Sequence, residues 1–136
     1  MTKHAFLTGY TGKPTRTPAQ LLQLAINLDA VVVDSRFHPA SRWATHWSRI
    51  PLGNAIGDRY LWLQEFGNSL YRQRKIKLHN PRAGLAHLDS VGITRAIILC
   101  ACEDGATCHR TQVGWFLAAN GWEVREVTRE EWRDAR

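Results

Sequence analysis

The hydrophobic positions of this chain occur in short continuous runs separated by longer polar stretches. Strands are predicted at 5–8, 30–34, 60–63, 95–101 and 122–127, and those at 30–34 and 95–101 are continuous apolar runs. Between the runs, apolar residues recur at helical spacing and predict helices at 18–28, at 81–91, and from 107 or 108 to 120. Strands that alternate with helices are typical of a parallel sheet covered on both faces.

Two helix starts carry local signals of their own. Thr17, Pro18 and Gln20 have the form of a capping box with proline at the first helical position. Thr128 begins a second capping box and predicts a short terminal helix. Residues 37–58 are rich in Pro, Gly, Ser and Trp, and predict a short helix within a long functional loop. We therefore expect residues 1–136 to form a single α/β domain, a three-layer sandwich with a mainly parallel, Rossmann-like sheet.

Composition limits the partners and the compartment. Lys and Arg outnumber Asp and Glu by 18 to 12, which gives a net charge of +6 and favours an anionic small molecule or a nucleic acid as partner. No apolar run approaches the roughly 20 residues that span a bilayer, and the first residues lack a signal-peptide core. Three cysteines are too few for a secreted disulfide framework, so we expect reduced thiols in a cytoplasmic protein. No membrane partner is expected, and the sequence does not indicate the oligomeric state.

Polar side chains follow the predicted strands. Because parallel strands end at one edge of a sheet, residues 9–13, 34–36, 64–68 and 100–110 should meet around one crevice. The turn 9–12 lacks the full glycine pattern of a dinucleotide-binding loop, and no cofactor is expected.

Asp34 and Arg36 lie two residues apart and point to the same side of an extended chain. They form either an internal ion pair, or a site in which Arg36 clamps an anion while Asp34 acts as a catalytic group. Arg42 and Tyr10 are predicted as further anion contacts, although Arg42 could instead pack on a neighbouring tryptophan.

Cys108, His109 and Arg110 fall in the first turn of a predicted helix, where unpaired N–H groups and the helix dipole favour anions. Arg110 is predicted to bind an anion there. Cys108 would be a catalytic nucleophile with a lowered pKa, or alternatively a small buried hydrophobic residue. His109 is a candidate acid or base, or a histidine that is merely hydrogen-bonded.

Cys100, Cys102 and Glu103 complete the candidate site. The set Cys100, Cys102, Cys108 and His109 could bind zinc, although its spacing is not that of a familiar zinc finger or ribbon. Cysteine loops of the phosphatase or rhodanese type need an arginine at a fixed short distance after the nucleophile. Arg110 is too far from Cys102 for this chemistry and too near Cys108.

The leading hypothesis is a small cytoplasmic enzyme that binds an anionic, nucleotide-like or nucleic-acid-like substrate and performs hydrolysis, group transfer or thiol chemistry. One alternative is a non-catalytic nucleic-acid-binding module. It would use the basic residues Arg72, Arg74 and Lys75, together with Trp43, Trp47 and Trp62. Another is a metal-binding or redox-sensing domain centred on the cysteines.

Several of these motifs together resemble the bacterial and archaeal family called domain of unknown function 488, over residues 7–127. The matching features are the turn 8–12, the helix 17–28, Asp34-Ser35-Arg36, Pro39-Ala40-Ser41-Arg42, residues 60–67, Cys100 and Cys108-His109-Arg110. Cys102 stands where the family usually has a glutamate, and Glu103 is its neighbour. The resemblance implies an α/β fold and a shared site, but no reaction, because the family has no assigned activity.

Overall fold

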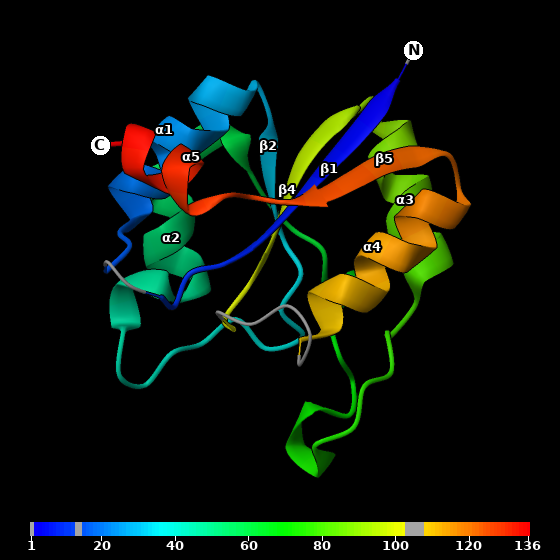
Figure 1. The fold of residues 1–136 in the computed structure, drawn as a ribbon. Helices are drawn as coiled ribbons and strands as arrows, with labels where there is room; N and C mark the ends of the chain where they lie inside the picture. Colours follow the sequence, from blue (N-terminus) through cyan, green and yellow to red (C-terminus); the bar gives the residue numbers. More distant parts are fainter. Residues whose placement is uncertain (1, 13–14, 103–107) are drawn as a thin grey trace.

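The structure is a computed structural model that describes residues 2–12, 15–102 and 108–136. These residues form a five-stranded sheet in the order β3-β2-β4-β1-β5, in which every neighbouring pair runs parallel (Figure 1). The strands are β1 (Lys3–Gly9), β2 (Val31–Asp34), β3 (Tyr60–Trp62), β4 (Arg95–Cys100) and β5 (Trp122–Glu126). The predicted α/β fold is confirmed, with strand ends shifted by one or two residues.

Helices cover both faces of the sheet. In Figure 1, α1 (Pro18–Leu28), α2 (Arg49–Ile56) and α5 (Arg129–Asp134) lie on one side, and α3 (Pro81–Ser90) and α4 (His109–Ala119) on the other. Successive residues of a strand face opposite sides. In β4, Ile97 and Leu99 accordingly join the core beneath α1 and α2, whereas Ala96 and Ile98 join the core beneath α3 and α4. This double burial explains why the central strands β2 and β4 are continuous apolar runs rather than alternating ones.

Both predicted capping boxes are present. At α1, the Gln20 amide donates to Thr17 Oγ1 at 3.2 Å, and the Thr17 amide donates to Gln20 Oε1 at 3.0 Å. At α5, the reciprocal bonds between Thr128 and Glu131 measure 3.1 and 3.0 Å. Each pair satisfies amides that the first turn of a helix leaves without a partner, so the sequence signal marks the helix start directly.

The long segment between β2 and β3 contains α2, as predicted, and a 3₁₀ turn at Thr45–Trp47. Trp47 is buried and stacks on Tyr10, with ring centroids 4.6 Å apart. The Arg49 amide donates to the Pro39 carbonyl at 2.9 Å, which closes the loop on itself. This packing holds the loop against the turn that follows β1.

The turns after three strands are joined at one edge of the sheet. The Tyr10 amide donates to the Cys100 carbonyl at 3.1 Å, and the Ser35 amide donates to the Leu99 carbonyl at 3.0 Å. The ends of β1, β2 and β4 therefore meet, as a parallel sheet requires. Within the described ranges, no helix is long and apolar enough to cross a membrane.

Candidate functional site

A buried ion pair lies at the end of β2. The Arg36 guanidinium meets the Asp34 carboxylate at two points, Nε to Oδ1 at 2.8 Å and Nη2 to Oδ2 at 2.7 Å. The Tyr60 hydroxyl donates to Asp34 Oδ2 at 2.5 Å. Both carboxylate oxygens are thus engaged by the chain itself, and Asp34 is fully buried. This placement gives no support to a catalytic Asp34; its carboxylate orients Arg36 instead.

Arg36 keeps its charge in this buried position. Burial by itself would lower the pKa of the guanidinium, but the hydrogen bonds and charge of Asp34 outweigh it and raise the pKa above its ordinary value. The Tyr10 ring packs on the same group, with Arg36 Cζ 5.4 Å from the ring centroid. The internal ion pair, one of the two interpretations of the sequence, is therefore present, and it fixes the Arg36 guanidinium in position.

One nitrogen of this cation has no acceptor. Arg36 Nη1 is buried and makes no hydrogen bond to any of the described residues. An unsatisfied buried donor costs about 1–3 kcal/mol. The Arg36 residue also lines a pocket.

The pocket has a volume of about 530 Å³ and is open on one side. Three cationic side chains line it: Arg36, Arg74 and Lys75. None of its described lining residues is an aspartate or a glutamate. The rest of the described lining consists of Tyr10, Phe37, His38, Ala40, Asn68, Tyr71, Ile76, Ala101, Cys102, Cys108 and His109. A cavity of this composition suits an anion with an apolar or aromatic part.

A loop between β3 and α3 carries part of the basic run to the pocket. The Asn68 side chain organises this loop, since its Nδ2 donates to the Lys75 carbonyl at 2.7 Å and its Oδ1 accepts from the Lys77 amide at 2.9 Å. In Figure 1 the loop, drawn in green, projects from the sheet. Arg74 and Lys75 reach the pocket lining, whereas Arg72 packs on Tyr71 outside it.

The three cysteines come together although Cys108 follows Cys100 by eight positions in the sequence. Their sulfur atoms lie within 4.8 Å of one another, and Cys100 Sγ is 2.8 Å from Cys108 Sγ. Hydrogen bonds from the other two thiols lower the pKa of Cys102, with a smaller lowering by the Arg110 charge. Burial raises the pKa of Cys100. Among the described residues, these sulfurs form the cluster that could hold a metal ion.

His109 is hydrogen-bonded to Ser35, the residue that follows β2. Its Nε2 lies 2.7 Å from the Ser35 carbonyl oxygen and 3.2 Å from Ser35 Oγ. A carbonyl oxygen only accepts, so Nε2 carries the proton and donates. The other ring nitrogen, Nδ1, lies 3.7 Å from Cys108 Sγ. His109 is therefore hydrogen-bonded within the protein, which was one of the two interpretations of this residue from the sequence.

Arg110 lies behind the thiols rather than in the pocket lining. Its side chain is almost fully buried, donates to Glu126 Oε1 at 2.8 Å through Nη2, and donates to Cys100 Sγ at 3.0 Å through Nη1. Nη1 also donates to the Cys102 carbonyl. The expected direct contact between Arg110 and an anion is not supported by this geometry; Arg110 supports the cysteine cluster.

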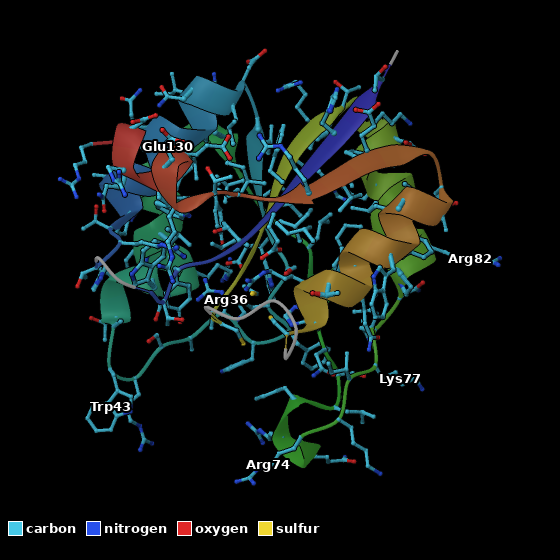
Figure 2. All side chains as sticks on the ribbon, in the orientation of Figure 1. Arg36, Trp43, Arg74, Lys77, Arg82 and Glu130 are labelled. Carbon is cyan, nitrogen blue, oxygen red and sulfur yellow. The ribbon has the colours of Figure 1, made fainter. Side chains whose placement is uncertain are left out.

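The remaining predicted residues lie in different places. Arg42 is exposed and is absent from the described pocket lining. Trp47 is too deeply buried to stack on a nucleic-acid base, which corrects that part of the nucleic-acid interpretation. Glu103 lies outside the described residues. In Figure 2, Arg36 lies inside the molecule, whereas Trp43 and Arg74 project from one end of it.

Sequence reasoning missed several residues that the pocket depends on. Phe37 and His38 line it directly after Arg36, and their position next to a predicted site residue could have indicated this. Tyr71 gave no such signal, because its role depends on how the loop closes; Asn68 does lie in the range 64–68 that was predicted to reach the crevice. Ser35 was quoted only as the spacer between two charged residues, yet it orients His109.

Comparison of the chain with models of protein families, with curated proteins and with solved structures finds no match. The resemblance to domain of unknown function 488 therefore stays a prediction. What the site does has to be argued from its own geometry.

Proposed function

We propose that this protein is a small enzyme whose substrate carries a phosphate-like anion and an apolar or aromatic part, as a nucleotide does. The observation that carries the proposal is the pocket with three cations and no carboxylate among its described lining residues. One of those cations, Arg36, is fixed in place with its Nη1 donor unsatisfied within the described chain.

The anion would lie against Arg36. A guanidinium held by a carboxylate through two of its nitrogens loses little side-chain entropy when the third meets a ligand. Arg74 and Lys75 add charge from the opposite loop, and Cys108 and His109 bring the amino end of α4 to the same pocket. Unpaired amides and the dipole at a helix start favour anions. Phe37 and Tyr71 offer ring surfaces for the uncharged part of the ligand.

His38 is the group best placed to exchange a proton with the bound substrate. It is exposed and lines the pocket, whereas Asp34 and His109 are committed to bonds inside the chain. The reaction would be hydrolysis or transfer of the anionic group, because an imidazole and fixed cations are the usual requirements of such chemistry. We place the protein in the cytoplasm, where its three thiols would stay reduced.

Titration calorimetry with AMP and with inorganic phosphate tests the binding step. We expect both to bind, AMP more tightly because its base contacts the rings of the pocket. The double variant Arg74→Ala/Lys75→Ala should bind AMP at least about tenfold more weakly, since each charge-assisted contact contributes about 1.5 kcal/mol or more. The matched control Arg72→Ala removes a neighbouring cation outside the described lining and should leave affinity unchanged. Absence of binding, or equal losses in both variants, would contradict the proposal.

A nucleic-acid-binding module is the second candidate, and one observation favours it. Trp43 is 93% exposed and lies at the same end of the molecule as Arg74 and Lys77 (Figure 2). An exposed indole and cations on one end of a protein can both contact a single strand that is long enough to reach them. Under this alternative, a single-stranded oligonucleotide binds more tightly than AMP, and both Trp43→Ala and Arg72→Ala weaken it. Affinity would also fall steeply with salt.

A further inference from the structure

The three cysteines require an explanation that anion binding does not supply. They are the only cysteines in the chain, and their sulfurs gather within 4.8 Å of one another. They come from the end of β4 and from the residue that caps α4. The sulfurs of Cys100 and Cys108 lie 2.8 Å apart and are therefore in direct contact.

His109 has a ring nitrogen next to one sulfur of the cluster, and a small movement of the ring would have to bring it toward the other two sulfurs. Because its Nε2 donates to the Ser35 carbonyl at 2.7 Å, the neutral ring has an unprotonated Nδ1, and this atom lies 3.7 Å from Cys108 Sγ. A tetrahedral zinc ion with ordinary bond lengths separates its sulfur and nitrogen ligands by about 3.6 Å. A backbone carbonyl that fixes the tautomer of a histidine is the usual outer partner of a metal-binding imidazole.

Arg110 supplies the outer partner of a sulfur. Its Nη1 donates to Cys100 Sγ at 3.0 Å, while its Nε and Nη2 contact Glu126. This hydrogen bond holds the guanidinium against the Cys100 sulfur. Hydrogen bonds of this kind orient and tune the ligands of a metal site.

A disulfide bond explains fewer of these contacts than a metal ion does. A bond between Cys100 and Cys108 would leave the third sulfur, on Cys102, unexplained. It would also leave His109 Nδ1 without a donor and the Arg110 guanidinium against a sulfur that carries no charge. A four-ligand metal site uses all of these groups, and requires the sulfurs of Cys100 and Cys108 to separate to about 3.8 Å.

We propose that Cys100, Cys102, Cys108 and His109 Nδ1 form a structural site for a thiophilic divalent cation of the zinc type. Four protein ligands close the coordination sphere, so the ion has a structural role and not a catalytic one. It would tie the end of β4 to the start of α4 and, through Ser35, to the end of β2. Since Cys102, Cys108 and His109 also line the pocket, the ion would fix one wall of it.

Cobalt serves as the probe, because Co²⁺ enters zinc sites and reports its ligands by absorption. One equivalent of Co²⁺ added to the reduced, metal-free protein should give sulfur-to-cobalt charge-transfer bands and the intense visible bands of tetrahedral geometry. Zn²⁺ should remove both sets of bands and raise the melting temperature. Absence of these bands in protein with three titratable thiols would overturn the proposal.

Cys102→Ser tests the ligand set at its least buried member, where the fold is least at risk. We expect the charge-transfer intensity to fall by about one third, since one of three sulfurs is lost, and metal affinity to fall by more than about 100-fold. His109→Gln should keep the full charge-transfer intensity and change the visible bands. Spectra that neither variant alters would place the ion elsewhere and overturn the site.

Arg74→Ala separates this inference from the proposed function. It should weaken AMP binding and leave the cobalt spectrum as in the wild-type protein. If the wild-type protein binds AMP but gives no cobalt spectrum, the metal inference fails and the anion pocket stands. If purified protein has fewer than three free thiols, and a reductant alone restores them without any metal release, the cluster is a disulfide and the inference fails as well.

Discussion

At the scale of single residues, the site depends on which groups donate hydrogen bonds to the Asp34 carboxylate. Its two oxygens accept hydrogen bonds from Arg36 and from the Tyr60 hydroxyl. Breaking a buried ion pair is far more damaging than replacing it whole, so Arg36 is a poor first target for mutation. Tyr60 is a better one, because it touches the pair without carrying its charge. Burial, the charge of Asp34 and the hydrogen bond to it raise the pKa of Tyr60, so the hydroxyl stays a donor.

Tyr60→Phe should lower the free energy of unfolding by about 1–3 kcal/mol, since a buried carboxylate loses one donor while the ring packing is kept. Urea unfolding followed by circular dichroism measures this. Tyr71→Phe is the matched control: its hydroxyl is exposed and accepts from Arg72, and we expect a change of less than about 0.5 kcal/mol. Equal effects of the two substitutions would show that the Tyr60 hydroxyl does not support the ion pair.

The sequence alone predicted that Asp34 and Arg36 act together at the end of β2, but it did not predict which role each of them has. Asp34 and Arg36 were placed together by their spacing, and the structure confirms that they pair. That Arg36 Nη1 has no acceptor among the described residues follows from Asp34 engaging Nε and Nη2, which the spacing of the two residues could not show. The direction of Arg110 depends likewise on Glu126 in β5, so local sequence could not show it.

At the scale of elements, two helices approach the core through glycine. In α3, a Cβ added at Gly84 would lie 2.6 Å from Phe66 Cε1, and Phe66 is fully buried. In α2, a Cβ added at Gly53 would lie 3.4 Å from the Tyr60 ring, which is ordinary contact. The sequence does not distinguish the two glycines, because the difference is in how close the neighbouring aromatic ring lies.

The two alanine substitutions should therefore have opposite signs. Gly84→Ala forces Phe66 out of its place and should destabilise the fold by about 1–3 kcal/mol. Gly53→Ala meets no obstacle and should stabilise it by about 0.5–1 kcal/mol through helix propensity. Thermal and urea unfolding measure the change in the free energy of unfolding for both variants. Destabilisation by both would mean that α2 packs more tightly against Tyr60 than described.

The elements themselves were the most predictable part of the chain. Capping boxes at Thr17 and Thr128 and continuous apolar runs reflect local physics, and the structure confirms them within one or two residues. The loop between β3 and α3 was not predictable in the same way. It is shaped by the Asn68 side chain bonding to residues seven and nine positions away, a pattern without a sequence signature.

At the scale of the whole molecule, the strand order creates the pocket. β4 lies between β1 and β2, so the turns that carry Tyr10, Arg36 and Cys102 meet although they are far apart in sequence. The rule that parallel strands share one edge predicted this convergence. It could not predict that the basic loop at 74–75 closes over the same edge, because the loop is placed by packing outside the sheet.

The central claim is that Arg36 holds an anion in this pocket, and a crystal structure of the reduced protein with AMP tests it most directly. The account predicts the phosphate within hydrogen-bond distance of Arg36 Nη1, with Arg74 or Lys75 as a second contact. Phosphate density elsewhere on the surface, with Nη1 still lacking an acceptor, would contradict it.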